Sequence, residues 1–278
     1  MDLNGEALMN DAADISWSGG SATFNTLMKA VQMILTKTPE ELFPDAWKLT
    51  VESILPWFIG AGAVLVNLFF LIGFLRQNTN LKENVTIESW IEGAIRVIVA
   101  NSLILNGVGI LEDFIGISTA ATKFVVGKEV VQIVNPDFDA GTLLFYLFVG
   151  IIYFIASAVC GILILIVILK RVLYIDYSIA VMPIGIATFA GGRGFENSGI
   201  AWIKTFLTYC FEIVAIAFLL RVGSVMASGL PAFILDAANE SGMFDGFWNG
   251  INNLVVMVFL TSVIKNADDL VRRSFDLR

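Results

Sequence analysis

Residues 142–169 read TLLFYLFVGIIYFIASAVCGILILIVIL, an apolar stretch without a charged residue, and Lys170 and Arg171 follow it directly. A helix rises about 1.5 Å per residue, so this stretch can cross a hydrocarbon core of about 30 Å with some tilt. The composition of the chain agrees, because 57% of its 278 residues are hydrophobic and the mean hydropathy is +0.80. Composition and pattern therefore predict an all-α, polytopic transmembrane protein.

Four further stretches are predicted to cross the membrane, over residues 53–75, 90–115, 200–222 and 247–264. Before the fourth span, Pro183 and Gly185 interrupt the helical pattern and predict a broken, re-entrant segment over about residues 172–192. Basic residues are enriched in short loops on the cytoplasmic side of a membrane. Their distribution here favours five full spans plus the re-entrant segment, with the amino terminus outside and the carboxyl terminus inside. Six full spans are the alternative.

Residues 1–52 are predicted to form an external amphipathic region ahead of the transmembrane domain, residues 53–278. Apolar side chains recur in it at helical spacing, at Phe24, Leu27, Met28, Val31, Ile34 and Leu35. Such a face lies on the membrane, on a partner or on the chain's own helices, and the sequence leaves these alternatives open. Thr38-Pro39-Glu40-Glu41 has the pattern of a capping box and predicts the start of a helix that runs into the membrane.

Residue types suited to catalysis are scarce in this chain. It has no histidine, and its two cysteines, Cys160 and Cys210, lie in apolar runs and are predicted to be packing residues. Because there is also no nucleophile motif, metal-spaced cluster or Walker loop, we expect no enzyme activity and no cofactor. The formal net charge of −8 gives no basic groove for DNA phosphates.

A polar face runs along the predicted fourth span. Lys204, Thr208 and Glu212 are spaced at i, i+4 and i+8, so they share one side of a helix that is otherwise apolar. Inside a membrane such a face must meet protein or water. Two interpretations are open. In one, the face lines a pore or a subunit interface, with Glu212 pairing with Arg96 or Lys204 of a neighbouring copy. In the other, it is a buried polar seam within one subunit.

Other polar residues in the predicted spans have local explanations. Glu92 and Arg96 are one helical turn apart and are predicted to form an ion pair. Asp176 is predicted to lie at the membrane interface and to balance the two basic residues before it, with a proton relay as the bolder alternative. Asn67 and Asn101 are predicted to form hydrogen bonds between helices.

A resemblance to a known family covers about residues 169–220. The stretch Ala180-Val181-Met182-Pro183-Ile184-Gly185-Ile186-Ala187-Thr188-Phe189 precedes a glycine-rich turn with Arg193, and Ala201-Trp202-Ile203-Lys204 then opens another span. This arrangement resembles the TrbL family and the related sixth VirB protein, which are polytopic inner-membrane subunits of type IV secretion and conjugation machines. Pro183, Arg193 and Trp202 are the family-like residues.

The resemblance implies a homo-oligomeric ring in the bacterial cytoplasmic (inner) membrane, within the translocation path or at the pilus base. It also implies partners, namely other type IV secretion subunits that include an ATPase and pilus or channel components. DNA or protein in transit would contact the chain only transiently.

Two other functions fit the same residues. A secondary transporter or ion channel would use Glu212, Asp176 and the break at Pro183 as a mid-membrane site, and internal inverted repeats would support it. The sequence shows no convincing repeat. A membrane assembly scaffold without a conduit is the second alternative, and the sequence alone does not separate it from the secretion subunit.

Overall fold

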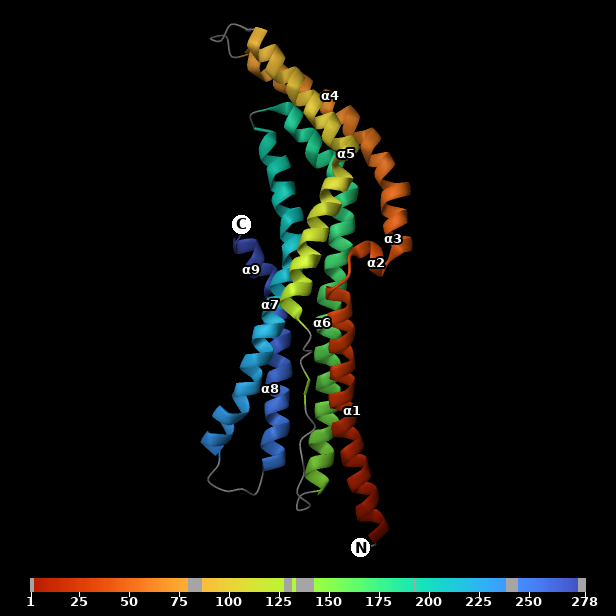
Figure 1. Cartoon of the computed structure of the whole chain (residues 1–278), viewed down its shortest axis with the longest axis vertical. Coiled ribbons are helices and arrows are strands. Elements are labelled where there is room, and N and C mark those ends of the chain that lie inside the picture. Colours follow the sequence, from red (N-terminus) through yellow and green to blue (C-terminus); the bar gives the residue numbers. More distant parts are fainter. Residues whose placement is uncertain are drawn as a thin grey trace. The chain divides into compact units, whose positions relative to one another are not determined.

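A computed structural model describes the backbone of residues 3–79, 87–127, 132–133, 143–192, 194–238 and 245–274, and side chains except those at 3–10, 77–79, 88–89, 143–146, 227–238 and 245–249. All of its elements are helices (Figure 1). They are α1 (Leu3–Leu35), α2 (Pro39–Leu42), α3 (Pro44–Lys48), the π-helix η1 (Leu49–Ile54), α4 (Leu55–Thr79), α5 (Ile87–Val126), α6 (Leu143–Ala187), the 3-10 helix η2 (Thr188–Gly191), α7 (Glu196–Ala238), α8 (Asp245–Lys265) and α9 (Ala267–Ser274). The all-α prediction is confirmed for these residues.

Four helical stretches in the described part are long and apolar enough to cross a membrane: Pro44–Arg76, Trp90–Val126, Leu147–Gly191 and Glu196–Met226. They contain or overlap four of the five predicted spans, as a multi-pass membrane protein requires. The span predicted over residues 247–264 lies in α8. The number of crossings and the orientation of the chain stay predictions.

The predicted break at Pro183 and Gly185 is wrong. Helix α6 runs without interruption from Leu143 to Ala187 and contains both residues, so the described part of the predicted third span and residues 172–187 of the predicted re-entrant segment form one helix. At about 1.5 Å per residue this helix is about 67 Å long, roughly twice a hydrocarbon core. Proline removes one ladder hydrogen bond, and here the loss falls close to the helix end. The chain turns later, at Gly192, whose φ of +67° suits glycine.

The chain divides into two compact units. Unit 1 comprises Met1–Thr36, Ala121–Leu169 and Ile213–Ala267, and unit 2 comprises Lys37–Ala120, Lys170–Glu212 and Asp268–Arg278. Helices α6 and α7 therefore each contribute one part to each unit. Of the predicted N-terminal region 1–52, the first 36 residues belong to unit 1 and the rest to unit 2, and the division into an external region and a transmembrane domain stays a prediction.

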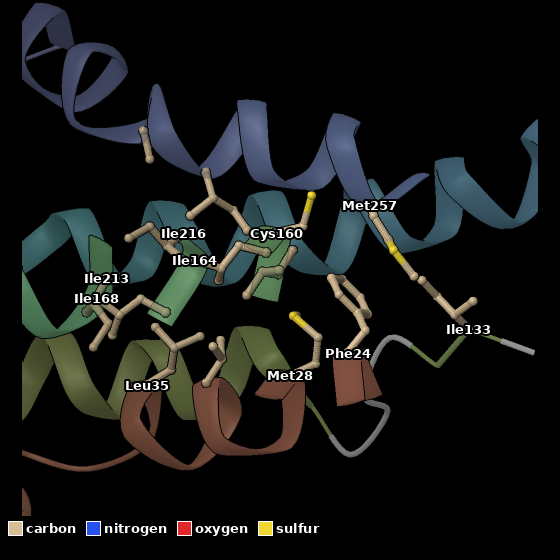
Figure 2. Packing of buried hydrophobic residues seen from close by; sticks show 14 of the residues in the cluster. Phe24, Met28, Leu35, Ile133, Cys160, Ile164, Ile168, Ile213, Ile216 and Met257 are labelled. Carbon is tan, nitrogen blue, oxygen red and sulfur yellow. The ribbon is translucent and has the colours of Figure 1, made fainter. Parts of the chain in front are cut away.

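In unit 1, helix α1 packs against α6, α7 and α8. Figure 2 shows Phe24 and Met28 of α1 in one apolar cluster with Ile164 of α6, Ile216 of α7 and Met257 of α8. The other buried members of the α1 face are Val31 and Leu35. The amphipathic face predicted from the sequence therefore packs on the chain's own helices, which was one of the alternatives left open.

Polar contacts hold the same face of α1. The Ser21 and Tyr153 hydroxyls are 2.8 Å apart, and the Trp17 and Tyr153 ring centroids are 4.5 Å apart. The Asn25 side chain donates to the carbonyl of Ile133 at 3.0 Å and accepts from its N–H at 2.9 Å. This amide thus satisfies both backbone groups of Ile133, whose side chain enters the core of unit 1.

The capping box at Thr38 is confirmed. The Thr38 hydroxyl oxygen accepts from the N–H of Glu41, and the Glu41 carboxylate accepts from the N–H of Thr38, both at 3.2 Å. The helix that it opens, α2, ends after Leu42, so it does not run into the membrane as predicted. The candidate membrane stretch begins instead at Pro44, where proline suits the first helical turn.

Unit 2 contains two helical hairpins, α4 with α5 and the second part of α6 with the first part of α7. In the α6–α7 hairpin, Gly185 lies against Trp202 near the turn, and Arg171 contacts Tyr209 further from it, so the two segments are antiparallel. A Cβ on Gly185 would lie 2.7 Å from Cγ of Trp202. The absence of a side chain at this glycine therefore allows close packing of the two helices.

Helix α4 packs against the α6–α7 hairpin through another glycine. A Cβ on Gly62 would lie 2.7 Å from Cβ of Pro183, so the proline ring occupies the space that a side chain would need. Both residues that the sequence analysis assigned to a helix break are thus contact residues between helices. Close approach through small residues is typical of helices that pack within a membrane.

Candidate functional site

Arg171 is the centre of a polar cluster in unit 2. It lies on α6 and only 4% of its surface is exposed. Its Nε–H donates to the carbonyl of Tyr209 at 2.6 Å, and Nη2 donates to the carbonyl of Cys210 at 3.2 Å. The planar guanidinium fork presents two donors at once, which matches two consecutive carbonyls on the neighbouring helix. One buried arginine thus ties α6 to α7.

Glu212 supplies the acidic side of the cluster. It follows Tyr209 by three residues on α7, and it is 5% exposed. Its carboxylate interacts electrostatically with Arg171, Arg272 and Lys170, all attractively, and with Asp268, repulsively. None of these groups forms a direct ion pair with it among the described residues. At an effective dielectric constant of about 20, two unit charges about 4 Å apart attract each other by about 4 kcal/mol, and the attraction weakens as their separation grows.

Helix α9 brings a second arginine to the cluster. Arg272 forms an ion pair with Asp268 at 2.7 Å, and its guanidinium carbon lies 5.8 Å from the centroid of the Tyr209 ring. Its Nη2 also reaches the Tyr209 hydroxyl at 3.5 Å. Burial lowers the pKa of Arg272, but Asp268 and Tyr209 raise the pKa more, so the guanidinium stays charged. Tyr209 thus connects α9 to α7 by its ring and α6 to α7 by its carbonyl.

Lys170 and Asp176 complete the charged residues on this part of α6. Lys170 is exposed, with its Nζ 5.1 Å from the centroid of the Tyr174 ring. Asp176 is only 8% exposed, and its Oδ1 has no hydrogen-bond partner among the described residues. The carboxylate is buried and pairs with neither of the neighbouring basic residues, so the predicted charge balance is absent, while the predicted position of Asp176 at the membrane interface stays a prediction.

The predicted polar face on α7 lies largely inside the chain. Thr208 is fully buried and donates its hydroxyl to the carbonyl of Lys204 at 2.9 Å, and Glu212 is buried in the cluster just described. Lys204 is half-buried. Of the two interpretations, this arrangement favours the polar seam within one subunit. Pairing of Glu212 with Arg96 or Lys204 of another copy stays untested.

The remaining predicted polar residues lie elsewhere in unit 2. Arg96 and Glu92 form the expected ion pair, with Nη2 and Oε1 2.5 Å apart. Asn67 and Asn101 donate to the carbonyls of the residues four positions earlier, on their own helices, at 3.2 and 3.1 Å. The predicted hydrogen bonds from these amides to other helices are therefore absent among the described residues. The side chain of Arg193 lies outside them.

Both cysteines are free and buried, which confirms their predicted packing role. Cys160 belongs to the apolar core of unit 1 and Cys210 to that of unit 2. The part of the chain that the structure describes has no group of three His, Cys, Asp or Glu side chains that could hold a metal ion. The expectation that the protein uses no cofactor stays a prediction.

Sequence reasoning missed the three residues that organise the site: Arg171, Tyr209 and Arg272. From the sequence alone, Arg171 directly follows an apolar run, a position typical of basic residues that mark the cytoplasmic end of a span. A usable signal was the position of Tyr209 and Glu212 three residues apart on one face of the next helix. That signal needs the register of the α6–α7 hairpin, which the misplaced helix break obscured.

Comparison with known proteins gives no relative on which to base an assignment. No protein-family model, no curated protein and no solved structure matches this chain.

Proposed function

We propose that this chain is a multi-pass subunit of a type IV secretion or conjugation machine in the bacterial cytoplasmic membrane. In this proposal it forms a homo-oligomeric ring within the translocation path or at the pilus base, beside an ATPase and other machine subunits. The amino terminus is outside and the carboxyl terminus inside. The proposal rests on the resemblance of residues 169–220 and on one structural observation.

That observation is that two of the family-like residues, Pro183 and Trp202, belong to one packed element. Pro183 contacts Gly62 of α4, and Trp202 packs on Gly185. These residues therefore determine how the two helices of the α6–α7 hairpin pack on each other and on α4. The part of α6 that begins at Lys170 is about 27 Å long, close to the thickness of a hydrocarbon core. Such a hairpin is suited to a membrane-embedded platform whose residues set helix packing rather than bind a substrate.

A conduit, in this proposal, forms between copies of the chain. The polar groups of the α6–α7 hairpin are engaged within one subunit, through Arg171 and Glu212. Helices α4 and α5 instead present exposed apolar side chains such as Leu68, Ile98 and Leu105. These surfaces are available for lipid and for neighbouring subunits.

A secondary transporter or ion channel is the second candidate, and Asp176 is the observation that favours it. A buried carboxylate oxygen without a hydrogen-bond partner is costly, and such groups mark ion or proton pathways in many membrane proteins. Under this alternative, replacing Asp176 with asparagine abolishes ion-dependent uptake while the folded protein persists.

The test is an in-frame deletion of the gene in its host, followed by measurement of mobile-element transfer or of effector secretion. Under the proposal, transfer falls to background and the intact gene restores it. Complementation with Asp176→Asn serves as the matched variant, because restoration by this variant separates the secretion subunit from an Asp176-dependent transporter. Normal transfer in the deletion strain would overturn the proposal.

A further inference from the structure

Two arginines flank the turn that closes the α6–α7 hairpin. Arg96 of α5 lies directly against Gly192, at the place where a Cβ would otherwise stand. Arg76, near the end of α4, has its Nη1 3.0 Å from the position of a Cβ on Gly194. The two glycines are two residues apart, so their Cα atoms are within about 7.6 Å of each other. Both guanidinium groups therefore reach one small region of the surface.

A small cavity opens beside Arg96. It has a volume of about 20 Å³, and Phe70, Phe74, Trp90 and the backbone of Gly191 are among the groups that line it with Arg96. This volume admits one group of the size of a water molecule or a single phosphoryl oxygen. Arg96 is the only charged residue among those that line the cavity, and three aromatic side chains form part of its wall.

The charges around this region leave donors available for an anion. Arg76 is exposed and forms no ion pair with the residues whose side chains are described. Arg96 gives Nη2 to Glu92, while its Nη1 is the atom that faces the turn. Glu92 is the acidic group in direct contact, and Glu196 begins α7 after the same turn. The arginines must therefore act through directional hydrogen bonds as well as net charge.

The surroundings fit the headgroup level of a bilayer. Trp90 is 52% exposed and its ring centroid is 4.6 Å from that of Phe74. Indole rings favour the boundary between headgroups and acyl chains. Beside it, Leu75 of α4 and Ile91 and Ile95 of α5 expose apolar side chains that can lie along acyl chains. Charged donors, an indole and an apolar surface thus occur together at one end of unit 2.

We propose that Arg76 and Arg96, with the cavity beside Trp90, bind the phosphodiester headgroup of an acidic phospholipid. One phosphoryl oxygen enters the cavity beside Arg96, a second accepts from Arg76, and the acyl chains lie on the exposed apolar side chains of α4 and α5. Guanidinium groups suit this task because they offer several donors to phosphate oxygens. This inference does not depend on the proposed role in secretion.

The test uses the full-length protein in detergent, with brominated lipids that quench tryptophan fluorescence on contact. Brominated phosphatidylglycerol should quench at about five-fold lower mole fraction than brominated phosphatidylcholine, in line with the attraction of basic residues near a membrane surface for anionic lipid. Arg76→Gln combined with Arg96→Gln should abolish this preference, so that both lipids quench at about the same mole fraction. Arg273→Gln, at an exposed arginine of α9, should leave the preference unchanged.

Glu92→Gln is a second variant that tests the proposal even if the double arginine variant does not fold. It frees Arg96 from its ion pair, so the preference for phosphatidylglycerol should increase. Equal quenching by both lipids in the unaltered protein would overturn the proposal, and so would a preference that survives loss of both arginines. Full displacement of the lipid by inorganic phosphate would assign the site to free phosphate and also overturn it.

Discussion

Replacement of Arg171 by methionine tests whether the buried guanidinium holds the α6–α7 hairpin together. The change removes two charge-assisted hydrogen bonds to the carbonyls of Tyr209 and Cys210, each worth about 1.5–3 kcal/mol. Those carbonyls lie inside α7 and keep their helical partners, so they add little further cost. Glu212, however, is left buried without the cation that attracts it most strongly. Removing one partner of a buried charged pair destabilises a protein by about 3–5 kcal/mol, and we expect Arg171→Met to fall in this range.

The same geometry predicts an asymmetry between the two partners. Glu212→Gln loses the attraction to cations that lie beyond ion-pair distance, but it also removes the cost of burying a carboxylate. We therefore expect the free energy of unfolding to fall by about 0–1 kcal/mol. The double variant should then be more stable than Arg171→Met alone by about 1–3 kcal/mol, because it no longer buries an unpaired acid.

Unfolding of the purified protein by sodium dodecyl sulfate in mixed micelles, followed by far-ultraviolet circular dichroism, measures these differences. Lys170→Met is the matched control, since it removes the adjacent exposed lysine and should change the unfolding midpoint far less than Arg171→Met. Equal effects at Lys170 and Arg171, or a double variant no better than Arg171→Met, would refute the proposed role of Arg171.

Three further predictions concern packing, the buried acid and topology. Gly62→Leu should destabilise unit 2 by about 1–3 kcal/mol, because its side chain would collide with Pro183, and an unchanged unfolding midpoint would contradict this contact. Asp176→Asn should leave the thermal midpoint unchanged or raise it, since an unpartnered buried carboxylate is replaced by a neutral amide; a large decrease would show that the carboxylate has a partner. Single cysteines at Asn197 and Glu240 should react with impermeant maleimide from opposite sides of the membrane, and labelling of both from outside would exclude the predicted orientation.

The helices could be predicted from the sequence because their signals are local. Apolar length alone located the stretches around residues 53–75, 90–115 and 142–169, and the capping box at Thr38 follows from four adjacent residues. The ion pair of Glu92 with Arg96 is equally local, one turn apart on one helix. Such features depend on helix geometry and need no knowledge of tertiary contacts.

The continuity of α6 could not be predicted from local signals. Proline lowers helix stability by about 3 kcal/mol in an isolated helix interior, which favours a break at Pro183. In the structure, Gly62 of another helix receives the proline ring, and this contact lies more than a hundred residues away in sequence. Tertiary packing therefore outweighs the local penalty.

The polar cluster around Arg171 could not be predicted for the same reason, because it depends on tertiary contacts. Arg171 and Tyr209 are separated by 38 residues, and they meet only if the chain turns at Gly192. A break placed at Pro183 and Gly185 shifts the register of the hairpin and separates these two residues. The polar face of α7 was identified correctly as a pattern, while its partner on α6 required the position of the turn.

We infer that the polar residues of the α6–α7 hairpin stabilise one subunit and do not line the conduit. The most direct measurement is transfer frequency in the deletion strain complemented with Glu212→Gln or with Arg171→Met, at protein levels determined by immunoblot. We expect near-normal transfer with Glu212→Gln, and loss of both protein and transfer with Arg171→Met. Loss of transfer by Glu212→Gln at a normal protein level would contradict this inference and place Glu212 in the conduit or at a subunit interface.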